Sequence, residues 1–324
     1  MDQRAGMARH AAFIGVLFLL LLRAAFALGE VTVSFTPACP RAGDYVDIAV
    51  DAGGEKVREV RYRLSPDGGK GSWSKKGEKH LTASFRPRSE GSWTLEVKVT
   101  LSGNRTETAS VTIPVSGSAP VQQGKDTVYS QMDGWWRQHL YTGTYRHTLE
   151  SSGCVIFVLS HALQRLGMEG EEVLPDRLAR SYGGYYTEGL GARSEALIAT
   201  AGIRLGFGTA HALVTAEDEI ISFLQEGSLF TLGIVQRHAV LVDGIDTESR
   251  KLHIVDSCPD STFEKLGRTP AWILAEDGTW QSVRSADEIP GVRWFFETSH
   301  CGGAEYWMDL DYCAARGLRL IRRP

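Results

Sequence analysis

Residues 151–167 read SSGCVIFVLSHALQRLG, a cysteine followed by a largely apolar run that ends at a glycine. This pattern predicts a helix that is apolar on most faces and therefore central to its domain. Ser151 or Ser152 can cap the helix, and Gly153 would let a substrate backbone approach closely. Cys154 would then lie in the first turn, where the helix dipole lowers the pKa of a thiol.

A histidine opens the second decisive segment, RHAVLVDG at residues 237–244, which is followed by LHIVD at residues 252–256. The apolar run predicts a buried strand, and turn residues at 247–250 predict a hairpin that returns the chain beside His238. A nearby imidazole stabilises a thiolate, which is the nucleophilic form of cysteine. Cys154 and His238 are therefore the candidate nucleophile and base; the alternative for Cys154 is a buried cysteine that acts as a small hydrophobe.

A third group should orient the imidazole and fix its tautomer. Asp256 ends the returning strand and is the first candidate, although a strand-end turn former is the alternative. Asp243 and Asp246 are weaker candidates, because Asp246 follows a glycine and suits a turn. His253 is the rival for the base, but its place inside the strand favours a solvent-side or hydrogen-bonded residue.

The order and spacing of these segments resemble the papain-like cysteine peptidases, and within them the bacteriocin-leader (double-glycine) peptidase family. The resemblance covers much of residues 127–260. Its pieces are VYSQMDGWW at 128–136, the Ser-Gly-Cys helix start, segments 174–182, 194–206 and 217–227, and the histidine hairpin. It implies a bacterial enzyme in which the side-chain amide of Gln131 binds the oxyanion together with the Cys154 backbone N–H.

Two departures from the family pattern bear on activity. The usual Gly-Cys-Gly-Pro is here Gly153-Cys154-Val155-Ile156, and the usual Asn-Asp-Pro is Asp256-Ser257-Cys258. The third site residue is thus Asp256 or, one position later, Ser257, which would stabilise an imidazolium less well. The resemblance implies a peptidase that cleaves peptide or isopeptide bonds, or an amidase or acyl-transferase variant of it. The departures favour an alternative, an inactive papain-like fold that serves as an extracellular or surface binding module.

The N-terminal third shows a different periodicity. Apolar residues alternate with polar ones at 31–35, 46–50, 60–64, 81–85, 93–101 and 111–115. Period-two segments separated by turns predict short strands, and six or seven of them predict a sandwich. The segment resembles bacterial immunoglobulin-like modules.

The second half of the chain places helices before strands. We expect helices at 154–166, 175–182, 194–201 and 216–225, and strands at 229–235, 238–243, 252–256 and 292–297. This segregation indicates an α+β fold. The expected architecture is a papain-like domain, whose central helix packs on an antiparallel sheet, preceded by a small all-β sandwich.

The expected organisation is a signal peptide at 1–27, an immunoglobulin-like β-sandwich at 28–117, a linker at 118–126 and a papain-like cysteine peptidase-like domain at 127–324. Residues 1–27 combine basic residues, an apolar run and Ala25-Phe26-Ala27 as a cleavage site. An uncleaved N-terminal anchor is the alternative. We therefore expect a secreted or extracellular protein, either free or held at the cell surface.

The net charge limits the classes of partner that we expect, and the cysteine count raises the question of disulfides. The 324 residues carry a formal net charge of −4, which does not suggest a nucleic-acid partner. We expect a peptide or protein substrate, no cofactor, and no metal site, since neither Cys-x-x-Cys nor His-x-x-x-His occurs. With Cys154 as the unpaired one of five cysteines, Cys301 and Cys313 are the first candidates for a disulfide, Cys258 is a rival partner, and Cys39 stands alone; five free thiols stay an alternative.

Overall fold

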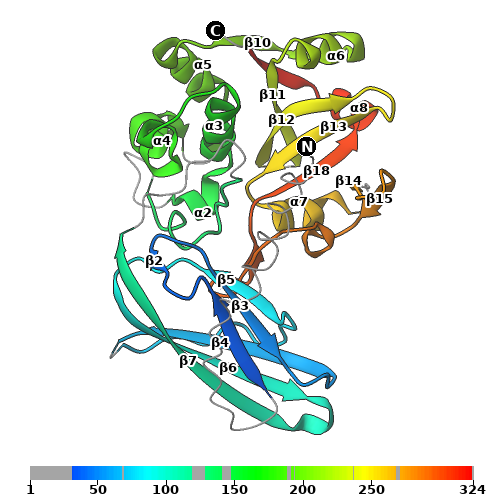
Figure 1. The fold of residues 1–324 in the computed structure, drawn as a ribbon. Helices are drawn as coiled ribbons and strands as arrows, with labels where there is room; N and C mark the ends of the chain where they lie inside the picture. The colour runs from blue at the N-terminus through cyan, green and yellow to red at the C-terminus, as the bar shows by residue number, and fades with distance from the viewer. Residues whose placement is uncertain are drawn as a thin grey trace, which may run out of the picture. The chain divides into compact units, whose positions relative to one another are not determined.

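The computed structural model describes residues 31–67, 69–118, 128–140, 147–187, 191–192, 194–235, 237–267 and 271–322 (Figure 1). The chain divides into two compact units, residues 1–121 and 122–324. The expected signal peptide and residues 119–126 of the expected linker lie outside the described residues. None of the helices in the described ranges has the length and apolar character needed to cross a bilayer.

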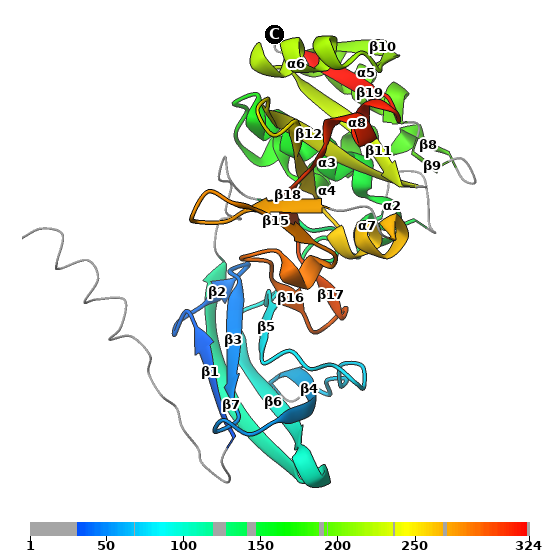
Figure 2. The same cartoon turned by 90° about the vertical axis from the view of Figure 1, so that its right-hand side faces the viewer.

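The N-terminal unit is a β-sandwich. One sheet contains β1 (Thr32–Thr36), β3 (Val46–Asp51) and β5 (Thr82–Phe85), all antiparallel. The other has the order β2-β7-β6-β4 and is built from β2 (Arg41–Ala42), β7 (Thr106–Ser118), β6 (Gly91–Leu101) and β4 (Val57–Pro66) (Figure 2). The alternating segments at 31–115 therefore form strands as predicted, and β2 is an addition that the pattern did not indicate.

Cross-strand register explains why one face of the larger sheet is buried. Tyr62 lies opposite Val97 and Leu64 opposite Leu95, while Leu95 is also paired with Val111 on its other side. These side chains face the same side of the sheet and are buried. Burying each large apolar side chain contributes about 1.5–3 kcal/mol, so the alternation itself specifies the register.

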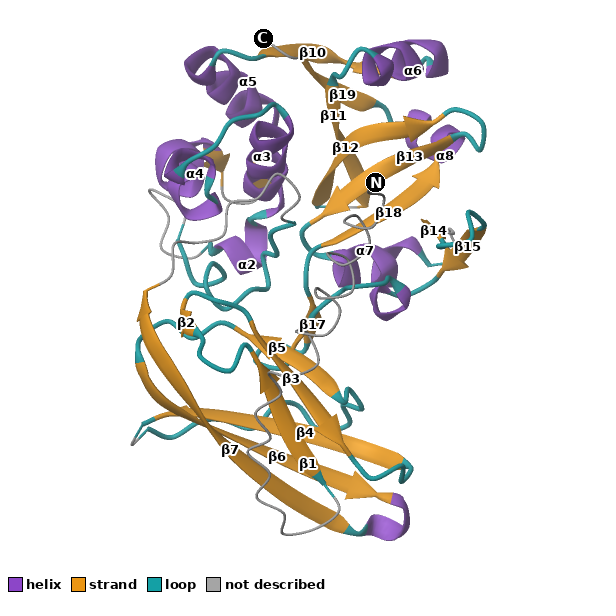
Figure 3. Ribbon diagram, in the orientation of Figure 1, coloured by secondary structure: helices purple, strands orange, loops and turns teal. Residues whose placement is uncertain are grey.

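The C-terminal unit is an α+β domain, as predicted (Figure 3). Within the described residues, one sheet of eight strands has the order β10-β19-β11-β12-β13-β18-β14-β15, and every pair in it is antiparallel. Its strands are β10 (Gly208–Val214), β11 (Leu229–Val235), β12 (His238–Asp246), β13 (Lys251–Asp256), β14 (Ala271–Leu274), β15 (Trp280–Val283), β18 (Ala304–Asp309) and β19 (Leu318–Arg322). Two short hairpins lie outside it, β8 (Tyr186–Thr187) with β9 (Gly191–Ala192) and β16 (Trp294–Phe295) with β17 (His300–Cys301).

The helices of this unit include the four that were predicted. They are α2 (Leu149–Ser152), α3 (Cys154–Arg165), α4 (Pro175–Tyr182), α5 (Ser194–Leu205), α6 (Glu217–Gln225), α7 (Pro259–Leu266) and α8 (Leu310–Ala314). Helix α3 is buried from Val155 to Gln164 and packs against β12 and β13. The prediction of a central helix against an antiparallel sheet is therefore confirmed at the level of fold class.

The last third of the chain differs from expectation. The strand expected at 292–297 is only the two-residue β16. Strands β18 and β19 were not predicted, yet β18 pairs with β13 and β19 lies between β10 and β11. The C-terminal segment is thus part of the central sheet.

The expected disulfide between Cys301 and Cys313 is wrong, because all five cysteines are free thiols. Strand β18 separates the two residues, and six extended residues span about 20 Å. A disulfide requires Cα atoms within about 7 Å of each other. Closeness in sequence therefore did not produce closeness in space.

Candidate functional site

Cys154 is the first residue of α3, and a separate short helix leads into it. Thr148 caps α2: its side chain accepts a hydrogen bond from the Ser151 N–H, and the Ser151 hydroxyl accepts one from the Thr148 N–H. The prediction that Ser151 or Ser152 caps the cysteine helix is therefore wrong, because both belong to α2. The residue before α3 is Gly153, which makes no side-chain cap.

Gly153 is required for a reason other than substrate access. A Cβ atom at this position would lie 2.3 Å from the carbonyl oxygen of Leu149. No side chain fits there unless the backbone moves, so the glycine allows α2 to lead directly into α3. The junction sets the position of Cys154.

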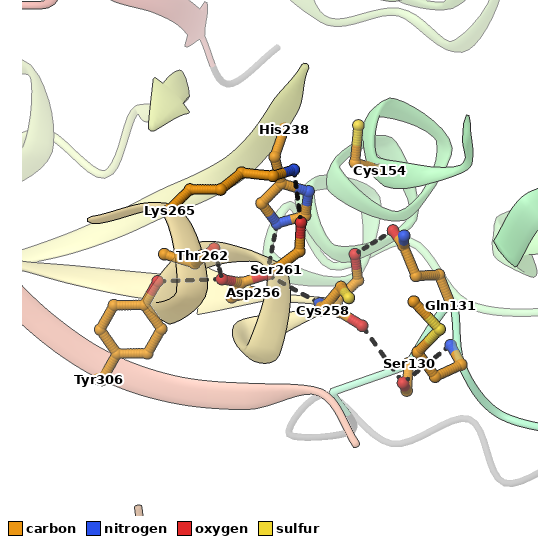
Figure 4. Close-up of polar contacts among 12 residues, drawn as sticks. Ser130, Gln131, Cys154, His238, Asp256, Cys258, Ser261, Thr262, Lys265 and Tyr306 are labelled. Atoms are coloured by element: carbon orange, nitrogen blue, oxygen red, sulfur yellow. Dashed lines mark hydrogen bonds and ion pairs between the residues drawn. The ribbon is translucent and has the colours of Figure 1, made fainter. Parts of the chain in front are cut away.

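His238 opens β12 and meets Cys154 from the other side (Figure 4). The thiol of Cys154 donates to the carbonyl oxygen of Arg237, with 3.9 Å between sulfur and oxygen. Arg237 has a positive φ of 66°, which is uncommon for a residue with a side chain and costs about 1–2 kcal/mol. The backbone is thus held in an unfavourable conformation directly beside the candidate site.

Asp256, at the end of β13, binds the imidazole of His238. The distance from His238 Nε2 to Asp256 Oδ1 is 2.8 Å, and both residues are buried. Because Nε2 faces the carboxylate, Nδ1 is the nitrogen left for Cys154. The predicted hairpin between β12 and β13 therefore brings Asp256 to His238 as expected.

The electrostatics favour an ion pair. Burial alone would raise the pKa of Cys154, but the hydrogen bond and charge of His238 and the N–H groups of Ala239 and Val155 lower it below the ordinary thiol value. Burial alone would lower the pKa of His238, but the charge and hydrogen bond of Asp256 outweigh it and raise this pKa to about 10. The pKa of the thiol is thus lowered and that of the imidazole raised, and both directions favour an imidazolium beside a thiolate.

The carboxyl of Asp256 stays ionised although it is fully buried. Burial raises its pKa, but the charge and hydrogen bond of His238, with the donors of Thr262 and Cys258, lower it below the usual value. The Cys258 N–H donates to Oδ1 over 2.8 Å, and the hydroxyls of Thr262 and Tyr306 donate to Oδ2 over 2.6 and 3.0 Å. Thr262 and Tyr306 were not among the predicted site residues, although the alternating segment AEYWMD at 304–309 is a pattern that predicts a strand containing Tyr306.

Gln131 is buried next to the start of the cysteine helix. Its side-chain Nε2 donates to the carbonyl oxygen of Glu150 in α2 over 3.1 Å, and its Oε1 accepts from the Ser257 hydroxyl over 3.1 Å. Its backbone N–H donates to the Ser257 carbonyl. A primary amide carries two N–H donors, so the second can serve a ligand. Ser257, the alternative to Asp256, thus contacts Gln131 rather than His238.

The remaining candidates have other partners. Asp243 Oδ1 lies 2.6 Å from His253 Nδ1, and Asp243 Oδ2 accepts from Arg165 over 2.6 Å. Asp246 accepts hydrogen bonds from the Glu248 and Ser249 N–H groups and forms the turn. His253 is accordingly a hydrogen-bonded strand residue. Among the described residues, no group of three or more His, Cys, Asp or Glu side chains is arranged to hold a metal ion.

Comparisons with known proteins find likenesses to solved structures only. No protein-family model and no curated protein matches this sequence. Similar solved structures include the fn3 domain of human collagen alpha-1(XX) chain, at 15% identity over 31% of this chain and 93% of that chain, with a TM-score of 0.24. The PKD domain of the human VPS10 domain-containing receptor SorCS2 is similar at 20% identity over 28% of this chain and 76% of that chain, with a TM-score of 0.21.

A third solved structure matches over a longer range. It is a carbohydrate-binding module of the β-sandwich super family, at 9% identity over 90% of this chain and 88% of that chain, with a TM-score of 0.23. At these identities and TM-scores the likenesses carry no conclusion about this chain. The two-sheet sandwich of the N-terminal unit stands on its own strand pairing.

Proposed function

We propose that the protein is a secreted cysteine peptidase with a papain-like domain that cleaves peptide or isopeptide bonds in a peptide or protein substrate. The observation that carries the proposal is the 2.8 Å hydrogen bond between buried His238 and Asp256, with Cys154 facing the same imidazole from α3. Three groups from distant parts of the sequence thus have the order of a nucleophile, a base and an orienting carboxylate.

The chemistry follows from this order. The Cys154 thiolate attacks the substrate carbonyl carbon, and the oxyanion forms beside the Cys154 N–H and the Gln131 amide. The His238 imidazolium donates its proton to the leaving amine as the carbon–nitrogen bond breaks, which leaves a thioester on Cys154. His238 then takes a proton from water, which attacks the thioester and releases the acid. Asp256 keeps the imidazole oriented and stabilises its positive charge.

Val155 and Ile156, which stand where the family pattern has Gly and Pro, are compatible with this chemistry. Val155 and Ile156 are buried, with 5% and 0% of their surface exposed, so their side chains pack in the core. They occupy helix positions that face away from solvent. Cys154 itself is only half-buried, which is compatible with a thiol that a substrate can reach.

A second candidate function is a papain-like binding module without catalysis. The observation that favours it is that the Gln131 amide already donates to the Glu150 carbonyl, which leaves only one of its two N–H groups for an oxyanion. In this role the fold, with the β-sandwich as a spacer or surface attachment, would bind an extracellular partner. Partner binding that persists in Cys154→Ala, with no cleavage by the wild type, is the result expected of this candidate.

The deciding experiment measures how fast iodoacetamide alkylates Cys154 between pH 4 and 9, with the sites mapped by mass spectrometry. We expect labelling to persist well below the ordinary thiol pKa of about 8.5. His238→Ala should restore an ordinary thiol titration, because the imidazolium is removed. His211→Ala is the control, since His211 is exposed on β10 and pairs with Glu195.

A Cys154 that titrates as an ordinary thiol in the wild type would contradict the proposal. If the thiolate is present, peptide libraries should be cleaved by the wild type and not by Cys154→Ala of unchanged fold. Adding an amine acceptor to the same assay separates hydrolysis from acyl transfer, because only transfer yields the new amide.

A further inference from the structure

The carboxylate of Asp256 has more partners than its bond to His238 requires. An ionised carboxylate offers about four lone-pair positions. Four donors occupy them: His238 Nε2 and the Cys258 N–H on Oδ1, and the Thr262 and Tyr306 hydroxyls on Oδ2. With both oxygens engaged, the carboxylate cannot rotate away from the imidazole without breaking several hydrogen bonds.

The two hydroxyl donors come from elements after the hairpin. Thr262 is on α7, which begins three residues after Asp256. Tyr306 is on β18, where it lies opposite Ile254 of β13, while Ala304 lies opposite Asp256. Residues two apart on a strand share a face, so Tyr306 and Asp256 lie on the same side of the sheet. The rings of Tyr306 and Phe263 are 5.4 Å apart, which packs α7 against β18.

Both donors are fixed in place and keep their protons. Thr262 and Tyr306 are 0% and 1% exposed, so water does not replace either hydroxyl. Burial, and then the nearby Asp256 carboxylate, raise the pKa of Tyr306 well above its ordinary value, so the phenol stays protonated and donates. Hydrogen bonds to a buried charge are stronger than those between neutral groups.

We propose that Thr262 and Tyr306 are positioning residues that keep the Asp256 carboxylate ionised and aimed at His238, so that α7 and β18 belong to the catalytic unit. This inference rests on the proposed function and assigns part of the site to a segment that the sequence resemblance does not reach. Neither residue touches the reacting atoms. Each acts through Asp256 on the imidazolium and, through the imidazolium, on the Cys154 thiolate.

The expected effect has a definite direction. Without the two hydroxyls, the carboxylate holds its charge less well and supports the imidazolium less, so the thiolate of Cys154 loses stabilisation. The titratable groups that face Asp256 from the packed elements are His238 on β12, His161 on α3, Cys258 before α7 and Tyr306 on β18. The variant Tyr306→Phe removes only the hydroxyl of Tyr306 and keeps the ring that packs on Phe263.

The experiment uses the full chain and the variants Tyr306→Phe, Thr262→Val and their combination. The pH profile of Cys154 alkylation is recorded for each, and the titration of His238 is followed by NMR. In the double variant we expect the pH below which alkylation of Cys154 slows to rise by about one unit, and the pKa of His238 to fall. The variant Thr262→Ser keeps the hydroxyl and should show the wild-type pH profile. Tyr312→Phe, on α8, is the matched control for Tyr306→Phe.

The outcomes separate this inference from the proposed function. An ordinary thiol titration of Cys154 in the wild type overturns both. If alkylation of wild-type Cys154 persists to low pH, and the double variant shows the same pH profile and the same His238 titration, the inference alone is overturned. Circular dichroism verifies the fold of each variant, and if the double variant unfolds, the single Tyr306→Phe variant decides between the outcomes.

Discussion

His161 lies on α3, two turns after Cys154, and is buried. Its Nε2 accepts a hydrogen bond of 2.9 Å from the Tyr129 backbone N–H, two residues before Gln131. Burial, together with the charge of Arg165, lowers the pKa of His161 to about 3. The side chain is therefore neutral in the folded protein, whereas in the unfolded chain it takes up a proton near pH 6.5.

This difference makes folding stability depend on pH at a single residue. Between pH 6.5 and about 3 the unfolded state holds more protons, so the free energy of unfolding falls as the pH is lowered through this window. The contribution is fully present above pH 6.5, and its loss amounts to at most about 1.4 kcal/mol per pH unit. We expect His161→Gln, which keeps an acceptor for the Tyr129 N–H, to make the fall with pH shallower.

Urea unfolding of the wild type and His161→Gln at a series of pH values from 4 to 7 measures this slope. His211→Gln is the control, because it makes the same substitution at an exposed histidine. Parallel stability curves for the wild type and His161→Gln would show that His161 does not titrate differently in the folded and unfolded states.

Three of the four predicted site residues could be assigned to one site from local sequence patterns. Cys154, His238 and Asp256 follow from a helix start, a strand start and a hairpin, which are local patterns. Gln131 came only from the family resemblance, since nothing in its own loop indicates an approach to α2. The partners Thr262 and Tyr306 depend on contacts across 6 and 50 residues, and tertiary contacts of this kind have no local signal.

At the scale of elements, the junction of α2 and α3 decides where the thiol lies. A methyl group at residue 153 would collide with the Leu149 carbonyl, which is backbone and cannot rotate away. We expect Gly153→Ala to cost about 1–3 kcal/mol in the free energy of unfolding, as overpacking does. It should also slow alkylation of Cys154, because the shifted helix start moves the thiol relative to His238.

Gly184→Ala is the matched control, since a Cβ there would meet nothing within 4 Å. Chemical denaturation and alkylation kinetics of both variants measure the two effects. Wild-type stability and wild-type labelling in Gly153→Ala would mean that the junction accepts a side chain and does not fix Cys154.

Elements with strong local periodicity were predictable, and those that depend on distant partners were not. The strand at 229–235 and the helix at 175–182 have the predicted bounds, because a continuous apolar run or a Pro-initiated amphipathic turn defines them. Strand β19 (LRLIR) is short and ends near the end of the chain, so only its pairing with β10 and β11 makes it a strand. The strand predicted at 292–297 is present only as the two residues of β16.

At the scale of the whole molecule, the state of the cysteines shows whether disulfide bonds contribute to stability. All five thiols are free, and three of them, Cys258, Cys301 and Cys313, are buried. A disulfide between Cys301 and Cys313 would close a short loop and contribute about 3 kcal/mol, but β18 holds the two residues apart. Neither unit therefore depends on a disulfide for its stability.

Counting thiols in the denatured, unreduced protein with a thiol-specific chromogenic reagent should give five per chain, the full cysteine content of the sequence. In the native protein, exposed Cys39 and half-buried Cys154 should react first, because burial protects the other three and raises the pKa of Cys258 and Cys313 to about 12. Adding a reductant should leave the thermal midpoint unchanged, since there is no bond to break. A count lower by two, with a midpoint that falls on reduction, would mean that a disulfide forms and that β18 does not keep Cys301 and Cys313 apart.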